Sequence, residues 1–256
     1  MNQIHYKYIN NENKPVILFL HGFLGSLEDW SDIYSDLKGD YSFLLIDLPW
    51  HGNSGGVKSM EDAALSIVSL LNSLGLQSVY LYGYSLGGRL ALYLTLRYPQ
   101  YFIKVIIESA SPGLKSEQER QARINNDERL AQRLENVPLN DFLSFWYNQP
   151  LFANLVRQDD FAQIFERRLK NNAERLAQSL RTLGTGEQSS LWDEIKNNSL
   201  PVILVTGKSD NKFTAIAQEM CKLNKLFFCK KVENSGHTVY TENRPAVIEI
   251  IKGFFK

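Results

Sequence analysis

A serine between two glycines is the residue pattern in this chain that most directly suggests chemistry. The stretch "YGYSLGGRLAL" at residues 82–92 places Ser85 between Gly83 and Gly87. Where a strand turns sharply into a helix, a Gly-x-Ser-x-Gly sequence holds the serine hydroxyl exposed at the edge of a sheet. The same five residues can also form an ordinary glycine-rich turn. The apolar run "SVYLY" before them and the apolar segment after them favour a nucleophile elbow.

A serine hydroxyl becomes a base or a nucleophile when a histidine, itself oriented by a carboxylate, accepts its proton. After a nucleophile elbow, the acid and then the histidine follow the serine along the chain. His237 is the only histidine after Ser85. Asp210 follows the apolar run "PVILVTG", and Glu108, at the end of an earlier run, is the alternative acid. Asp210 is preferred because the next predicted strand leads directly to His237.

Backbone amides near the serine are expected to stabilise negative charge that develops during a reaction. One should be the amide of Leu86, directly after Ser85. The other should come from the loop "HGFLGS", where Phe23 is the best candidate. His21, in the same loop, is expected to organise the loop and not to take part in the chemistry.

One arginine falls where an apolar residue is expected. Phe161, Ile164, Phe165 and Leu169 form an apolar stripe at helical spacing, and Arg168 occupies a position in the same stripe. A buried arginine is unfavourable unless it is paired. The pattern leaves three alternatives open: a side chain that reaches solvent at the edge of the stripe, a salt bridge to a core carboxylate, or an anion-binding site.

Two further arginines could approach the serine. Arg89 lies four residues after Ser85 in an otherwise apolar helix, whereas Arg123 by itself would be ordinary for a solvated helix face. Three arginines that converge on one serine would suit a substrate with several carboxylates, because a guanidinium binds a carboxylate through two hydrogen bonds. Tyr84 and Trp146 could supply apolar walls, although Trp146 could equally belong to a hydrophobic core.

Apolar runs alternate with helical patterns through most of the chain. Strands are expected at 15–22, 41–49, 78–83, 102–109, 200–207 and 225–232, and helices at 60–75, 86–99 and 245–255. Continuously apolar strands that alternate with helices indicate an α/β fold whose mostly parallel sheet is covered by helices on both faces.

Residues 111–195 interrupt this alternation. They contain no convincing strand, and their first helix opens with a capping box formed by Ser116 and Glu119. We therefore expect a helical cap at 111–195, inserted into a core of residues 1–110 and 196–256. The cap should cover the C-terminal ends of the strands, where open parallel sheets bind ligands.

The composition argues against several kinds of partner. Lys plus Arg and Asp plus Glu both number 28, so the formal net charge is zero, and neither nucleic acid nor an anionic membrane is an expected partner. The longest apolar runs are too short to span a bilayer, and "MNQIHYKYIN" lacks the pattern of a signal peptide. We expect a cytoplasmic protein with no metal or cofactor, in which Cys221 and Cys229 are reduced.

Six segments together resemble a known family. They are "FLHGFLGS", "DLPWHGNS", "GYSLGGRLALY", "ESASPGLKSEQERQAR", "FWYNQPLF" and "TGKSDNKF". They are similar to the 2-succinyl-6-hydroxy-2,4-cyclohexadiene-1-carboxylate (SHCHC) synthases of menaquinone (vitamin K2) biosynthesis, which have the α/β-hydrolase fold. The resemblance runs from about residue 14 to the C-terminus. Its specific parts are "ESASPGL", the arginine-bearing cap and "GKSDNKF", because a very large superfamily shares the other motifs.

The resemblance implies a lyase that eliminates pyruvate from 2-succinyl-5-enolpyruvyl-6-hydroxy-3-cyclohexene-1-carboxylate. Ser85 would act as a general base assisted by His237 and Asp210, and no acyl-enzyme would form. The amides of Phe23 and Leu86 would stabilise the delocalised negative charge.

The resemblance also implies a substrate-binding set for this tricarboxylate, which consists of Arg89, Arg123, Arg168, Tyr84 and Trp146. Trp50 departs from the family, where a glycine is usual, and it could narrow the mouth of the pocket.

Two other functions remain open at this stage. A carboxylester or carbon–carbon bond hydrolase would use the same three residues, with Ser85 as a nucleophile. A non-catalytic binding protein of the same fold would not need all three. Without the resemblance, the residues do not distinguish a lyase from a hydrolase, and they do not predict the oligomeric state.

Overall fold

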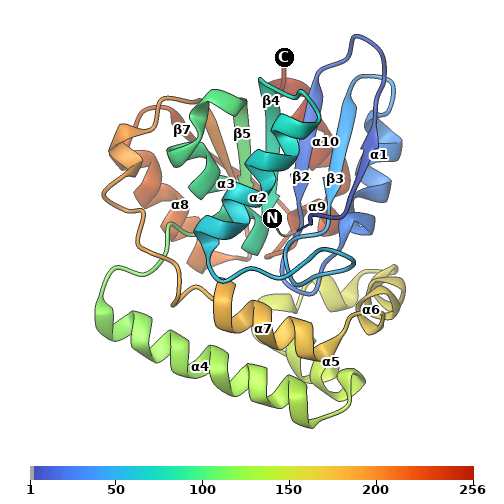
Figure 1. The fold of residues 1–256 in the computed structure, drawn as a ribbon, viewed down its shortest axis with the longest axis vertical. Coiled ribbons are helices and arrows are strands. Elements are labelled where there is room, and N and C mark those ends of the chain that lie inside the picture. The colour runs from blue at the N-terminus through green and yellow to red at the C-terminus, as the bar shows by residue number, and fades with distance from the viewer. Residues whose placement is uncertain (1–2) are drawn as a thin grey trace.

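A seven-stranded sheet forms the centre of the computed structural model, which describes residues 3–256 (Figure 1). The strand order is β1-β3-β2-β4-β5-β6-β7, and every neighbouring pair is parallel except β1 with β3. The strands are β1 (Tyr6–Ile9), β2 (Val16–Leu20), β3 (Ser42–Ile46), β4 (Val79–Tyr84), β5 (Phe102–Glu108), β6 (Val202–Gly207) and β7 (Phe227–Val232). All predicted strands are present. β1 was not predicted, because its sequence "YKYI" is short and largely exposed.

Helices cover both faces of the sheet, as predicted. The core helices are α1 (Ser31–Leu37), α2 (Met60–Ser73), α3 (Leu86–Arg97), α8 (Asn211–Leu223), α9 (Val239–Glu242) and α10 (Arg244–Phe254). Leu18 and Leu20 of β2 pack with α2, α3 and α8, whereas Ile17 and Phe19 pack with α1 and α10. Because successive side chains of a strand point to opposite faces, a sheet buried on both faces needs continuous apolar runs.

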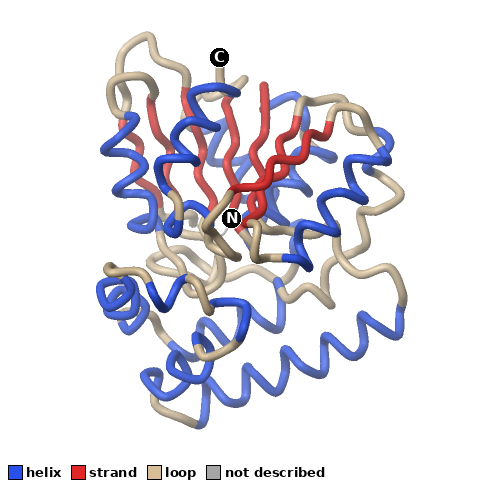
Figure 2. The backbone as a smooth tube through the Cα atoms, turned by 180° about the vertical axis from the view of Figure 1, so that it is seen from behind, coloured by secondary structure: helices blue, strands red, loops and turns tan. Residues whose placement is uncertain are grey.

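Four further helices lie together at the C-terminal ends of the strands (Figures 1 and 2). They are α4 (Glu117–Asn136), α5 (Leu139–Tyr147), α6 (Phe161–Leu169) and α7 (Ala173–Leu183). They share a hydrophobic core of their own that includes Leu134, Phe142 and Leu176. Ser116 and Glu119 form the predicted capping box at the start of α4. This arrangement supports our proposal of a cap at 111–195.

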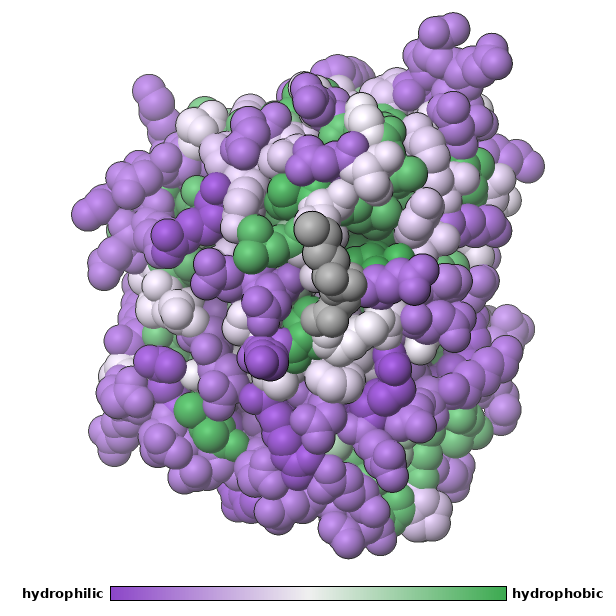
Figure 3. Space-filling view, in the orientation of Figure 1, coloured by the Kyte–Doolittle hydropathy of each residue, from purple (hydrophilic) through white to green (hydrophobic). Residues whose placement is uncertain are grey.

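Shorter 3-10 helices connect these elements, at Leu27–Trp30, Pro99–Tyr101, Pro150–Phe152, Leu155–Arg157 and Ile195–Asn197. The surface of the cap helices is mostly hydrophilic, with small apolar patches (Figure 3). Among residues 3–256, no helix is both long and apolar enough to cross a membrane.

The expectation of two reduced cysteines is wrong in this structure. Cys221 in α8 and Cys229 in β7 form a disulfide. They are eight positions apart along the chain, and the packing of α8 against β7 brings their sulfur atoms together. The cysteine count alone could not show this pairing.

The turn from β4 into α3 is tightly packed against the end of β2. A Cβ atom added at Gly87 would lie 2.2 Å from the Leu20 carbonyl oxygen and 2.5 Å from that of His21. The Gly87 amide also donates a hydrogen bond to the His21 carbonyl at 3.0 Å. The position therefore requires glycine, because any side chain would push α3 away from the sheet.

We expect Gly87→Ala to lower the free energy of unfolding by about 1–3 kcal/mol, the usual effect of overpacking. Gly253→Ala in α10 is the matched control, since nothing lies within 4 Å of its added Cβ atom. This control should raise stability by roughly 0.5–1 kcal/mol, because alanine favours a helix interior more than glycine does. Urea denaturation measures both effects. A Gly87→Ala protein as stable as wild type would contradict the close packing.

Candidate active site

Ser85 occupies a strained turn between β4 and α3. Its φ and ψ angles are 51° and −110°, a region that a non-glycine residue rarely adopts. Its amide donates to the carbonyl oxygen of Glu108 at 2.9 Å, which ties the turn to the end of β5. The structure thus has the nucleophile elbow that the Gly-x-Ser-x-Gly pattern predicted.

The three residues predicted as a triad lie together at this edge of the sheet. The Ser85 Oγ atom is 3.3 Å from His237 Nε2, and His237 Nδ1 is 2.8 Å from Asp210 Oδ2. The other oxygen of Asp210 accepts a hydrogen bond from the Phe213 amide at 3.1 Å, at the start of α8. His237 and Asp210 are both buried. Because Asp210 orients the imidazole, His237 can accept the serine proton through Nε2.

The alternative acid, Glu108, points to a different part of the core. Its carboxyl group accepts hydrogen bonds from the Tyr240 amide and from the Tyr82 hydroxyl. No hydrogen bond or ion pair joins it to His237 within the described chain. Burial raises the pKa of Glu108 to about 8. The geometry therefore favours Asp210, as the order along the chain had indicated.

The residues that carry the two predicted amides, Phe23 and Leu86, lie at the same site. Phe23 and Leu86 both line the cavity at Ser85. Within residues 3–256, neither backbone N–H has a hydrogen-bond acceptor. His21 organises the Phe23 loop as expected, because its Nε2 accepts from the Leu48 amide at 2.9 Å and its Nδ1 donates to the Gly22 carbonyl at 2.7 Å.

A cavity of about 210 Å³ opens beside Ser85, between the sheet edge and the cap. The core contributes Ser85, Leu86 and His237 to its wall, and the cap contributes Trp146 and Leu180. Arg89 and Arg123 line the same cavity. The structure therefore brings Arg89 and Arg123 to this cavity, whereas Arg168 lines a smaller cavity next to Ser85.

Arg89 is a buried cation without a carboxylate partner in the described chain. Its Nη1 donates to Gln188 Oε1 at 2.9 Å, and its Nη2 donates to the Leu183 carbonyl at 2.6 Å. Burial, reinforced by the positive charge of Arg123, lowers the pKa of Arg89 to about 9. Arg123 differs, because its Nε donates to Asp127 Oδ1 at 2.8 Å. Of the two arginines, Arg89 is therefore the more available to pair with an anion in the cavity.

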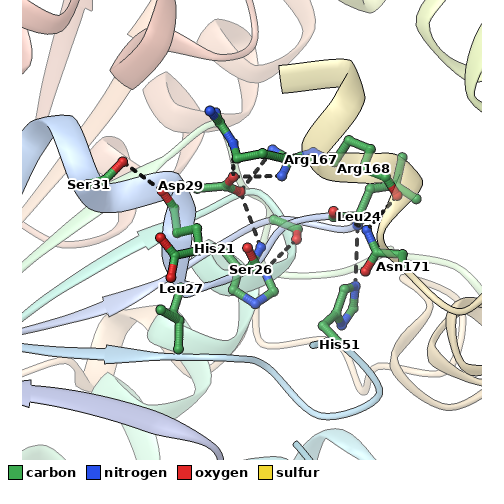
Figure 4. Close-up of polar contacts among 12 residues, drawn as sticks. His21, Leu24, Ser26, Leu27, Asp29, Ser31, His51, Arg167, Arg168 and Asn171 are labelled. Carbon is green, nitrogen blue, oxygen red and sulfur yellow. Dashed lines mark hydrogen bonds and ion pairs between the residues drawn. The ribbon is translucent and has the colours of Figure 1, made fainter. Parts of the chain in front are cut away.

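Arg168 forms a buried ion pair with a carboxylate of the protein (Figure 4). Its Nη1 and Nη2 atoms donate to Asp29 Oδ1 and Oδ2 at 2.6 and 2.8 Å, and its Nε donates to the Tyr147 hydroxyl at 3.3 Å. Asp29 and Arg168 are both buried. The protein therefore supplies a counter-charge for Arg168, as one of the three alternatives expected. Arg168 also lines the cavity of about 40 Å³ next to Ser85, and its role in substrate binding stays a prediction. The two residues are 139 positions apart, and the helical pattern could not identify the partner.

The two predicted aromatic residues have different surroundings. Trp146 lines the cavity, and its ring lies 5.3 Å from that of Phe23 and 6.0 Å from that of Phe142, so it belongs to both the wall and the cap core. The Tyr84 hydroxyl is 3.0 Å from Thr238 Oγ1. Tyr84 lines a separate, smaller cavity of about 40 Å³ next to Ser85.

Trp50 does not narrow the mouth of the cavity, contrary to the expectation from its position in "LPWHG". Its Nε1 donates to the Val57 carbonyl at 3.0 Å, and its ring covers Gly56. Trp50 therefore stabilises the loop after β3, and it is not part of the wall around Ser85.

Sequence reasoning missed several residues of the cavity wall. Lys212 and Phe213 line the cavity, and the Phe213 ring lies 4.7 Å from that of His237. Both belong to "GKSDNKF", so their closeness to Asp210 was a usable signal. Ser109 and Ser179 also line the cavity, but an isolated serine gives no comparable signal in sequence.

Comparison with known proteins shows relatives over nearly the whole chain. The model of the α/β hydrolase fold family matches residues 15–244. SHCHC synthase from Enterobacter sp. (strain 638) is 34% identical, over 91% of this chain and 88% of the relative. SHCHC synthase from Citrobacter koseri is 34% identical, over 92% and 91%. The solved structure of MenH from S. aureus superposes with a TM-score of 0.93 at 30% identity, covering 98% of this chain and 97% of that chain.

We expect Arg168→Met or Asp29→Leu alone to lower the free energy of unfolding by about 3–5 kcal/mol, because each leaves a buried charge without its partner. The double variant should lower the free energy of unfolding by less than the sum of the two single effects. Arg244→Met is the matched control, since this half-exposed arginine pairs with Asp32 and Asp36 at the surface and should change stability little. Additive effects of the two core substitutions in urea denaturation would contradict the pairing.

Glu108→Gln should change how stability depends on pH. In wild type, burial raises the carboxyl pKa from 4.5 to about 8, so the folded protein keeps a proton that the unfolded chain releases in this range. The contribution of this group to the free energy of unfolding is greatest below pH 4.5. It falls as the pH rises toward 8, by up to about 1.4 kcal/mol per pH unit. Glutamine does not ionise.

The stability of the Glu108→Gln variant relative to wild type should therefore increase between about pH 5 and 8. Urea denaturation at several pH values in that range measures the difference. A difference that stays constant with pH would mean that Glu108 is ionised in the folded protein.

Proposed function

Since the chain belongs to the α/β-hydrolase fold family and, within it, to the SHCHC synthases of menaquinone biosynthesis, we propose that it eliminates pyruvate from 2-succinyl-5-enolpyruvyl-6-hydroxy-3-cyclohexene-1-carboxylate. One observation carries the proposal: Ser85, hydrogen-bonded to His237, shares a cavity with Arg89, a buried arginine that forms no ion pair with a carboxylate of the described chain. A base beside a buried cation suits proton removal from an anionic substrate.

In this proposal Ser85 is the base of the elimination. As its Oγ atom takes a proton from the substrate ring, the serine proton passes to His237 Nε2, and Asp210 stabilises the resulting imidazolium. The electron pair of the broken C–H bond at C2 forms a C2=C3 double bond, and the electrons of the existing C3=C4 double bond move to form C4=C5. The C–O bond between C5 and the enolpyruvyl group then breaks. Pyruvate leaves as its enolate, which takes up the proton that the enzyme has gained.

The amides of Phe23 and Leu86 are proposed to stabilise the negative charge as it spreads over the substrate. Both line the cavity next to Ser85, and preformed N–H donors cost no reorganisation when the charge develops. Leu86 N–H also lies in the first turn of α3, where the helix dipole favours negative charge.

The carboxylates of the substrate are assigned to the arginines that face the cavity. Arg89 forms no ion pair in the described chain, and the contact of Arg123 with Asp127 uses Nε and not the Nη groups. Lys212 lines the same cavity and forms no ion pair among residues 3–256. Trp146 supplies an apolar wall. Tyr84 precedes Ser85, and its hydroxyl is held by its contact with Thr238.

No cofactor enters this mechanism, and a small tricarboxylate is the proposed partner. A cytoplasmic location fits a biosynthetic enzyme of this kind. In the cytoplasm, the disulfide between Cys221 and Cys229 would be exposed to reducing conditions.

The proposed function predicts pyruvate and SHCHC in equal amounts when the protein is incubated with the enolpyruvyl substrate. Ser85→Ala, His237→Ala and Asp210→Asn should each lower kcat by roughly 10³-fold or more, because the three residues act as a unit. Glu108→Gln is the matched control: it replaces a buried carboxyl group that does not contact His237, and it should keep most of the activity.

Two results would contradict this mechanism. Near-normal turnover by Ser85→Ala would exclude Ser85 as the base. A hydrolase with the same three residues would attack with Ser85 and form an acyl-enzyme. A substrate-derived mass added to Ser85 during turnover, detected by intact-mass spectrometry, would therefore favour the hydrolase.

A further inference from the structure

Ser179 lines the cavity, and its buried hydroxyl group has no hydrogen-bond partner among residues 3–256. Ser179 lies in α7 and is 1% exposed, and its Oγ atom is one of the few buried polar side-chain atoms of residues 3–256 that are unpaired. A serine inside a helix commonly donates to the carbonyl one turn earlier, as Ser144 in α5 does to Asn140 at 2.9 Å. An unpaired buried hydroxyl is unfavourable, so its position at a cavity indicates a partner that enters the cavity.

Ser179 lies close to the arginine contacts of the cavity. It precedes Leu183 by one helical turn, and the Leu183 carbonyl accepts the hydrogen bond from Arg89 Nη2. Arg123, from α4, lines the same cavity. An ion pair between Arg181 and Glu128 helps to fix α7 against α4. The hydroxyl therefore lies on the wall that also presents the two guanidinium groups.

The charges at this wall favour an anionic partner for the hydroxyl. Arg89 has no carboxylate within ion-pair distance in the described chain, and Asp127, which pairs with Arg123, is one negative charge beside two arginines. Asp127 Oδ2, Gln188 Nε2 and Ser109 Oγ are also buried and unpaired, so the region can rearrange its hydrogen bonds around a ligand. A carboxylate between the arginines would accept a hydrogen bond from Ser179 as well.

We propose that Ser179 donates a hydrogen bond to a substrate carboxylate that Arg89 and Arg123 hold, and so helps to select substrates with a carboxylate at this end of the cavity. The proposal rests on the proposed function and extends it to a specificity residue. Ser179 belongs to the cap, whereas Arg89 belongs to the core. A carboxylate bound by both would join the cap to the core through the substrate.

The test is Ser179→Ala, with Ser144→Ala in α5 as the matched control. Loss of a hydrogen bond to a charged group should raise KM for the enolpyruvyl substrate about 10-fold or more, with kcat nearly unchanged. The melting temperature should not fall, because the unpaired hydroxyl is removed along with its cost of burial. The Ser144→Ala variant should keep the wild-type KM.

Succinate provides a second probe that does not depend on turnover. Saturating succinate should raise the melting temperature of wild type more than that of Ser179→Ala. If wild type releases no pyruvate, the proposed function fails, and the succinate comparison still tests Ser179. An unchanged KM in Ser179→Ala, an equal succinate shift in both proteins, or no succinate shift in wild type would each overturn the inference.

Discussion

The buried ion pair between Asp29 and Arg168 holds the cap in its place over the core. Asp29 lies just after the loop that carries Phe23, and Arg168 lies in α6 of the cap. Next to the pair, the Asn171 side chain donates to the Leu24 carbonyl at 2.9 Å. Because one guanidinium joins the cap to the segment after this loop, the same contact helps to position the loop with the proposed oxyanion amide of Phe23.

The surroundings of each arginine determine what it can do here. Arg168 meets a carboxylate through two hydrogen bonds, Arg123 meets one through a single hydrogen bond, and Arg89 meets only neutral acceptors in the described chain. A paired guanidinium stabilises the fold, whereas a buried cation with neutral neighbours remains available to an anion. The pairing with carboxylates thus decreases from Arg168, between cap and core, to Arg89, in the wall of the Ser85 cavity.

Local patterns predicted the elements well where the physical cause was local. The apolar runs of β2 to β6 follow from burial on both faces, and the capping box of Ser116 and Glu119 satisfies backbone amides within one turn. β1 was missed because its exposed sequence lacks such a run. The Cys221–Cys229 disulfide and the position of Trp50 were misjudged because both depend on which segments pack together.

The sequence by itself determined the elbow at Ser85, the order of Ser85, Asp210 and His237, and the alternation that builds the sheet. These features follow from steric limits at glycine, from chain order and from side-chain periodicity, which are properties of neighbouring residues. Tertiary structure alone decided that His237 contacts Asp210 and not Glu108, and that Arg168 pairs with Asp29. A charge is neutralised by whatever lies within a few ångströms of it in space, and the chain brings such partners from far apart in sequence.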